Sequence, residues 1–140
     1  MLLPHLPDAF AAVVVGAGGG IGQAVVKALS ASQRPSRIIA VSRSPLEFAD
    51  PRIETLTADV SQEDGRTALQ QHLDKQPVHL VFNAIGILHD DADGIAPEKR
   101  MDDIDADHFA KVMHINAATP ALLLAAIKRS LQGKHPVVIG

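Results

Sequence analysis

Hydrophobic and polar positions change their spacing along the chain, and these changes predict strands and helices in alternation. Residues 11–15 form a short, uninterrupted apolar run, which is typical of a strand buried on both faces. Ile21, Val25 and Leu29 then recur at helical spacing. The pattern therefore predicts a helix that stops before Ser36.

The same periodicities predict the remaining elements. Further strands are expected over residues 37–42, 52–57, 78–82 and 136–139. Ser61 followed by Asp64 has the spacing of a capping box, so a helix is expected to begin there and reach about residue 75. Residues 105–131 are predominantly helical in pattern, and the aspartates near their start, Asp102, Asp103, Asp105 and Asp107, are expected to cap that helix.

This order of elements predicts an α/β fold. Its strands are too apolar to be half exposed, so they favour an open, doubly wound parallel sheet of the Rossmann type, with about five strands covered by helices. The link over residues 43–51 is the weak point, because it is short for a helical crossover between parallel strands.

Composition narrows the class of protein. The chain has 140 residues, which predicts a single domain over 1–140. Thirteen basic and sixteen acidic residues give a net charge of −3, which favours neither nucleic acid nor an anionic membrane as a partner. The N-terminus lacks the pattern of a signal peptide, and no apolar run approaches the length of a membrane span, so a cytoplasmic protein is expected. Neither cysteine nor a histidine spacing typical of metal ligands is present, so no metal site is predicted.

A glycine-rich turn joins the first predicted strand to the first helix. Its glycines match the pattern GxxxGxG at Gly16, Gly20 and Gly22, whereas the GxGxxG and GxxxxGK[ST] patterns both fail. Glycine lets the backbone turn tightly and come close to a phosphate at the positive end of the helix. The turn therefore predicts a nucleotide site, and the alternative is a tightly packed turn without a ligand.

The end of the second predicted strand bears on the choice of nucleotide. Ser42 and Arg43 stand where an acidic residue would bind the 2′-hydroxyl of NAD. A hydroxyl and a guanidinium there suit the 2′-phosphate, which favours NADP over NAD. The alternative is a solvated arginine at a strand end.

Together these segments resemble the short-chain dehydrogenase/reductase family across nearly the whole chain. Residues 15–22, with Gly18 and Ile21 inside the motif, resemble its TGxxxGxG cofactor motif. Asp59-Val60 resembles the pair that meets the adenine, and Asn83-Ala84-Ile85-Gly86 is similar to the NNAG motif near the nicotinamide ribose. Segments 87–89 and 97–99 most resemble its C-factor-like branch of small reductases.

The resemblance also implies a role for Asn116, whose main-chain carbonyl would hold a water of the proton relay. Pro120 lies four residues later and cannot donate to that carbonyl. If both residues share one helix, the carbonyl is free for a water. If instead Pro120 opens a new helix capped near Asn116, the same freedom has no function.

The family's proton transfer uses a serine and a Tyr-xxx-Lys motif, but this chain has no tyrosine. We therefore expect a fragment of a longer oxidoreductase that acts on a small carbonyl or alcohol, inactive alone. One alternative is a nucleotide sensor or scaffold without catalysis, and another is a folded chain whose turn no longer binds. The apolar helix over residues 117–131 predicts a homo-oligomer, because this helix packs between subunits in the family.

Overall fold

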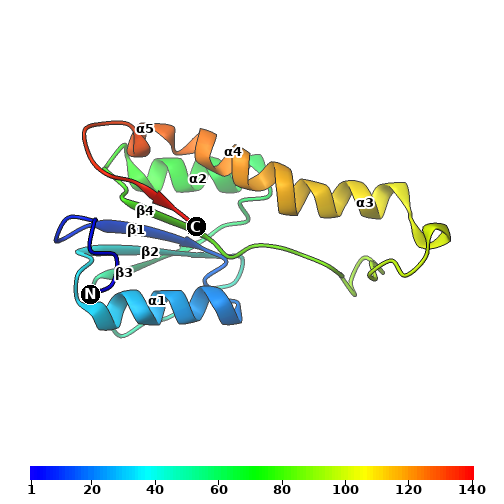
Figure 1. Cartoon of the computed structure of the whole chain (residues 1–140), viewed down its shortest axis with the longest axis horizontal. Helices are drawn as coiled ribbons and strands as arrows, with labels where there is room; N and C mark the ends of the chain where they lie inside the picture. Colours follow the sequence, from blue (N-terminus) through cyan, green and yellow to red (C-terminus); the bar gives the residue numbers. More distant parts are fainter.

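A parallel sheet of five strands in the order β3-β2-β1-β4-β5 forms the centre of the molecule (Figure 1). The computed structural model describes all residues 1–140. The strands are β1 (Ala11–Val15), β2 (Arg37–Ser42), β3 (Ile53–Thr57), β4 (Leu80–Asn83) and β5 (Val138–Ile139). From β1 the chain adds β2 and β3 on one side of the sheet and then β4 and β5 on the other, since β2 pairs with one edge of β1 and β4 with the other edge. This confirms the predicted doubly wound, Rossmann-like α/β fold.

Helices cover both faces of the sheet. They are α1 (Gly20–Ser32), α2 (Glu63–Leu73), α3 (Ala106–Met113), α4 (Thr119–Ala126) and α5 (Lys128–Leu131), with a short 3₁₀ turn (Met101–Asp103) before α3. Between α3 and α4 the chain forms one π-helical stretch, His114–Ala118, called the π segment below. α1 lies on one face, and α2, α4 and α5 lie on the other (Figure 1).

Strand β1 divides the core in two, because alternate side chains of a strand point to opposite faces. Ala12 and Val14 belong to the cluster that α1 covers. Val13 and Val15 belong to the cluster that α2 and α4 cover, together with Leu69. Every residue of β1 is buried, as its uninterrupted apolar run predicted.

The link between β2 and β3 contains no helix, although β2 and β3 pair in parallel. Its Leu46 and Phe48 pack against the cluster that α1 covers. Two apolar side chains therefore replace the helix that a crossover between parallel strands commonly contains.

The predicted capping box at the start of α2 is wrong. Gln62 is the residue before the helix and its side chain makes no capping bond. Ser61 lies one residue before that N-cap position, and its hydroxyl donates to Oδ1 of Asp59 at 2.6 Å. At α3 the expectation holds for Asp105, whose carboxylate accepts from the main-chain N–H groups of Asp107 and His108. Asp102 and Asp103 lie instead in the 3₁₀ turn before the helix.

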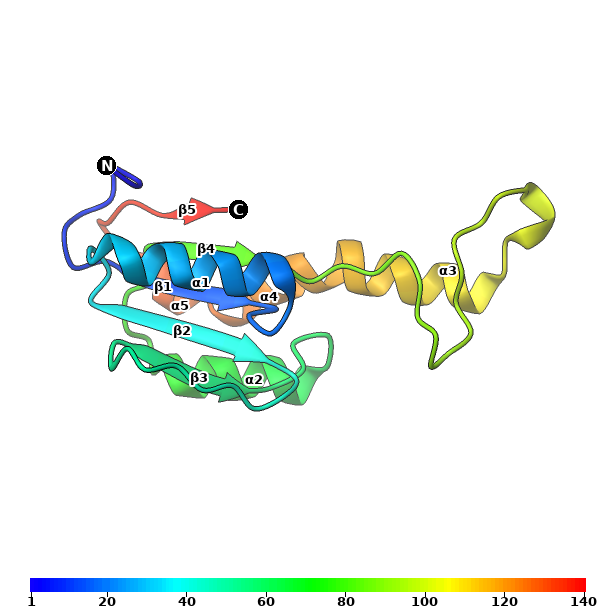
Figure 2. The same ribbon diagram turned by 90° about the horizontal axis from the view of Figure 1, so that it is seen from below.

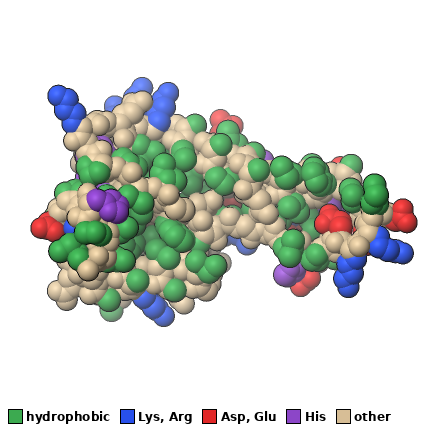
Figure 3. Space-filling model, viewed as in Figure 1, with side chains coloured by type: hydrophobic (Ala, Val, Ile, Leu, Met, Phe, Trp, Pro, Cys, Tyr) green, Lys and Arg blue, Asp and Glu red, His purple; other side chains and the backbone are tan.

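Residues 88–113 form an arm that extends away from the sheet (Figures 1 and 2). Lys111 pairs with Asp93 and lies 2.7 Å from Asp90, which joins α3 to the first residues of the arm. Ile95 is the arm's buried side chain, whereas apolar residues such as Met101 and Phe109 are exposed. Figure 3 shows apolar side chains along this arm, mixed with charged ones at its tip.

α3, the π segment and α4 together form a continuous helix of 21 residues, Ala106–Ala126. By length and composition alone this helix could cross a membrane, a test that core helices of soluble proteins also pass. The sequence pattern had predicted no run of that length, because Thr119, Pro120, Lys128 and Arg129 interrupt the apolar segment over residues 117–131.

Candidate functional site

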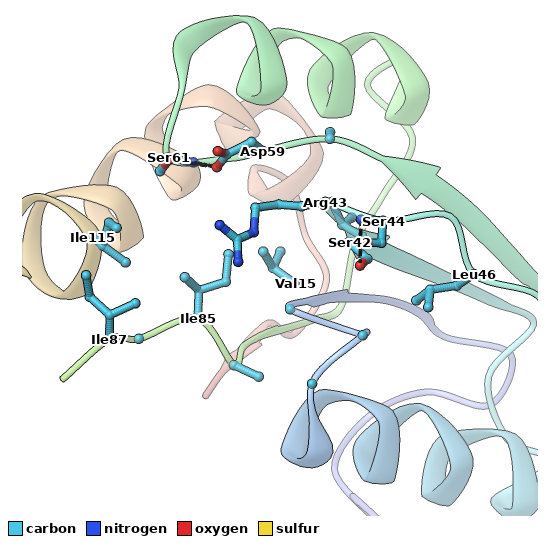
Figure 4. A pocket seen from close by; sticks show the side chains of 17 residues that line it. Val15, Ser42, Arg43, Ser44, Leu46, Asp59, Ser61, Ile85, Ile87 and Ile115 are labelled. Atoms are coloured by element: carbon cyan, nitrogen blue, oxygen red, sulfur yellow. Dashed lines mark hydrogen bonds between the residues drawn. The ribbon is translucent and has the colours of Figure 1, made fainter. Parts of the chain in front are cut away.

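A cleft of about 450 Å³ lies at the carboxyl ends of the strands, where ligands bind in doubly wound folds. Its walls come from the glycine turn after β1, the ends of β2 and β3, the segment after β4 and the π segment (Figure 4). Seven of the residues selected from the sequence line it: Gly16, Gly18, Ser42, Arg43, Asp59, Ala84 and Gly86. The carboxyl ends of neighbouring parallel strands meet at one edge, which brings these distant positions together.

Close packing explains why the turn after β1 contains glycine. Gly16 has φ +80°, and a Cβ there would lie 3.0 Å from the carbonyl group of Ala84. A Cβ on Gly18 would lie 2.7 Å from Oγ of Ser42, and one on Gly22 would overlap the carbonyl oxygen of Gly16. Side chains at these positions would push the turn away from β2 and β4, so the glycines keep the turn at the floor of the cleft.

The turn also leaves the start of α1 open. Gly19 is the N-cap residue, no side chain caps the helix, and its first turn contains no acidic residue. A Cβ on Gly20 would meet nothing within 4 Å, and Ile21 is 69% exposed. The free N–H groups and the positive end of the helix dipole therefore face solvent beside the cleft, which suits an anion.

Arg43 extends from the end of β2 into the cleft (Figure 4). It is exposed and makes no ion pair or hydrogen bond. The Oγ of Ser42 accepts from the main-chain N–H of Ser44 at 3.2 Å, and both serines line the same wall. This end of the cleft thus presents a free guanidinium and two hydroxyls without a carboxylate.

Asp59 and Val60 follow β3 but have different surroundings. The carboxylate of Asp59 lines the cleft, and its Oδ1 accepts from the N–H of Ser61 at 3.0 Å as well as from its hydroxyl. Val60 is fully buried in the core cluster under α2. A Cβ on Gly65 would overlap the carbonyl of Asp59, so this glycine lets α2 pack directly against the turn.

The segment after β4 forms the opposite wall. The side-chain oxygen of Asn83 accepts from the N–H of Ile85 at 3.2 Å, and the N–H of Ala84 donates to the carbonyl of Val15. Asn83 therefore shapes the turn from behind, while Ala84, Ile85 and Gly86 line the cleft.

Asn116 lies in the π segment and holds this wall with its side chain. Its Oδ1 accepts from the N–H of Ile87 and its Nδ2 donates to the carbonyl of Ile87, each at 2.7 Å. Ala118 and Thr119 have helical φ and ψ angles, so Asn116 and Pro120 share one helix. The alternative of a new helix capped near Asn116 is therefore wrong.

Several lining residues were not predicted as site residues, among them Ser44, Leu46, Ser61, Ile87 and Ile115. Ser44 and Ser61 follow strand ends within two residues of selected positions, and a wider window there would have found them. Ile115 offers no such signal, because only the path of the long helix brings it to the cleft. No group of three or more His, Asp or Glu side chains lies close enough to hold a metal ion.

A family model described as short chain dehydrogenase matches residues 11–139. No curated protein sequence is significantly similar to the chain. A carbonyl reductase from Pseudomonas aeruginosa PAO1 has a similar structure, with a TM-score of 0.75 and 22% identity over 93% of this chain and 59% of its own length. That reductase was also solved in complex with NADP.

Two further structures are similar in the same way. An NADPH-bound carbonyl reductase from chicken fatty liver has a TM-score of 0.72 and 22% identity, over 88% of this chain and 48% of its own. A short chain dehydrogenase from Leptospira borgpetersenii with bound NAD+ has a TM-score of 0.71 and 20% identity, over 92% of this chain and 50% of its own. The chain thus spans only about half of the length of these structures, and the likeness shows a shared fold.

Proposed function

The chain belongs to the short-chain dehydrogenase family, and on that premise we propose that it is the NADP(H)-binding portion of an oxidoreductase. In this proposal residues 1–140 are a single dinucleotide-binding domain and a fragment of a longer cytoplasmic protein. The complete protein would transfer hydride between the cofactor and a small carbonyl or alcohol substrate, with the nicotinamide ring supplying or accepting the hydride.

The residues of the cleft fit a dinucleotide. Gly16, Gly20 and Gly22 would hold the pyrophosphate at the uncapped start of α1, with Gly18 and Ile21 beside it. Asp59, next to Val60, would meet the adenine through its free Oδ2. Ala84 and Gly86 would lie along the ribose on the nicotinamide side, and Asn83 would hold their turn in place beside it. Asn116 would hold that wall and contribute its main-chain carbonyl to proton transfer in the complete protein.

The observation that supports NADP over NAD is the unpaired Arg43 beside Ser42. A guanidinium forms strong, charge-assisted bonds with a phosphate, whereas a ribose hydroxyl gains little from it. The neighbouring structures with NADP or NADPH support the same choice, and the one with NAD+ keeps the alternative open to experiment.

Titration of the chain with NADPH and NADH, followed by ligand fluorescence and thermal stability, tests this proposal. We expect NADPH to bind more tightly, and Arg43→Ala to weaken NADPH by about 10- to 100-fold while changing NADH little, since a charge-assisted bond contributes about 1.5–3 kcal/mol. Arg129→Ala on α5 serves as the matched control, because Arg129 lies outside the cleft. Equal binding of both cofactors by the unaltered chain would contradict the preference, and no binding of either would contradict the function.

A nucleotide sensor without catalysis is the second candidate, because the chain has no tyrosine to act as the family's proton donor. Both candidates predict that this chain binds NADPH without oxidising it in the presence of a ketone. The encoding reading frame distinguishes them. Continuation past Gly140 into a serine and a Tyr-xxx-Lys motif favours the reductase, and a natural stop favours the sensor.

A homo-oligomer through the helix around residues 117–131 belongs to the same proposal. Leu122 on α4 is 41% exposed and Met113 on α3 is 46% exposed, although both are large and apolar. A second copy would cover them, which stabilises association by removing apolar surface from water. We expect light scattering to give a dimeric mass or larger and Leu122→Glu to give a monomer. A monomeric mass for the unaltered chain would contradict this part of the proposal.

A further inference from the structure

His114, the first residue of the π segment, reaches across to the turn that follows Asp59. Its Nε2 lies 2.8 Å from the main-chain carbonyl oxygen of Ser61. Since a carbonyl oxygen can only accept, Nε2 carries the proton and donates. The bond joins residues 53 positions apart in the chain, and the part-buried ring lies between the π segment and the β3–α2 turn.

Ser61 connects this bond directly to the cleft. While its carbonyl accepts from His114, its N–H and hydroxyl both donate to Oδ1 of Asp59, at 3.0 and 2.6 Å. These two bonds fix the orientation of the Asp59 carboxylate and leave its Oδ2 without a partner. The position of the His114 ring therefore bears on the carboxylate that lines the adenine side of the cleft.

The main chain of His114 determines the local course of the helix. Its carbonyl accepts from both the N–H and the hydroxyl of Thr119, the latter at 2.8 Å, and Thr119 is fully buried. A carbonyl bonded five residues ahead marks a π turn, which widens the helix at this point. Ile115 then lines the cleft, and Asn116 holds both main-chain groups of Ile87. Residues 114–116 thus contact both walls.

We propose that His114 is a positioning residue that couples the Asp59–Ser61 turn to the π segment carrying Asn116. The coupling rests on the proposed function, because it has an effect only when a nucleotide binds against Asp59. A ligand that orders the turn also orders the Ser61 carbonyl, which holds the imidazole and through it the π segment. This series of hydrogen bonds physically links the adenine side of the cleft to the wall at Ile87.

Three variants isolate the donated hydrogen bond. His114→Phe keeps a flat ring but removes the donor, and His114→Gln restores an N–H at nearly the distance of Nε2. His108→Phe is the matched control, since His108 lies on the same helix near the tip of the arm and its ring is 4.0 Å from Asp105. Thermal unfolding of each variant shows whether it folds.

The probe is 2′,5′-ADP, which carries the adenine and the 2′-phosphate but no nicotinamide. We expect His114→Phe to weaken its binding up to about tenfold, the worth of one hydrogen bond, while His114→Gln and His108→Phe stay within about twofold. Amide hydrogen exchange at residues 115–118 should slow when 2′,5′-ADP binds to the unaltered chain and to His114→Gln. It should not slow in His114→Phe.

The results of these measurements distinguish failure of the coupling from failure of the proposed function. Equal affinity and equal ligand-induced protection in His114→Phe overturn the coupling and leave the proposed function standing. Weaker binding in His114→Gln to the same extent as in His114→Phe also overturns it, because the ring's shape rather than its donor then matters. If the unaltered chain does not bind 2′,5′-ADP, the proposed function fails and the coupling fails with it.

Discussion

The two walls of the cleft are built in different ways. The wall formed by β1, β2 and the glycine turn rests on strands buried on both faces and on backbone packed against backbone. The wall that runs from Gly86 into the arm is held by polar groups, notably Asn116 at Ile87 and, within the arm, Lys111 at Asp90. Regions with few buried contacts open at lower free energy than the core. The first wall is therefore suited to define the site and the second to adjust to what enters it.

The largest expected effect comes from breaking the backbone packing of the first wall. Gly22→Ala would place a Cβ on the carbonyl oxygen of Gly16, so we expect about 4 kcal/mol or more of lost stability and loss of nucleotide binding. Gly20→Ala is the matched control, since its Cβ meets nothing, and it should stabilise α1 by about 0.5–1 kcal/mol. Urea unfolding measures both, and similar losses in the two variants would contradict the packing argument.

Truncating an apolar side chain should cost more stability in the core beneath the sheet than on the arm. Leu69→Ala removes a fully buried side chain from the core under α2, for an expected cost of about 2–5 kcal/mol. Met101→Ala on the arm should change the free energy of unfolding by less than about 0.5 kcal/mol, because Met101 is 87% exposed. A comparable loss from Met101→Ala would show that the arm is packed in solution, for instance against a second copy.

As the pH falls, the sheet should lose stabilising interactions at a higher pH than the arm does. Burial and the nearby His135 lower the pKa of His79 below 6.5, and its Nδ1 accepts from the main-chain N–H of Ala11 at 3.1 Å. The unfolded chain then binds more protons than the folded one, so stability falls as pH drops below 6.5. The hydrogen bond from Lys111 lowers the pKa of Asp90 below 3.8, so that pair loses its contribution only as pH falls from there towards the lower folded pKa.

Thermal unfolding between pH 7.5 and pH 5 measures this difference. His79→Asn keeps an acceptor near the position of Nδ1 but cannot be protonated, and it should flatten the decline. An unchanged decline in this variant would assign the pH dependence to another group.

The sequence predicted the local structure of the first wall better than that of the second. Strands β1 and β2 and the turn between β1 and α1 were predicted nearly to the residue, because an apolar run and a glycine cluster are local signals. The capping box of α2 was predicted wrongly, since the one-residue offset of the N-cap to Gln62 and the bond from Ser61 to Asp59 do not show in the spacing of Ser61 and Asp64. For Asn116 and Pro120 the sequence left two structures open, and only the course of the helix decided between them.

The sequence by itself determined the class of fold, the parallel sheet and the edge at which Gly16, Arg43, Asp59 and Gly86 meet. It could do so because strand periodicity and chain direction place the carboxyl ends of successive parallel strands together. The tertiary structure alone decided that His114 reaches Ser61 and that Asn116 uses its side chain on Ile87. Those contacts depend on the angle of one long helix against the sheet, which packing at many positions sets together and no local pattern records.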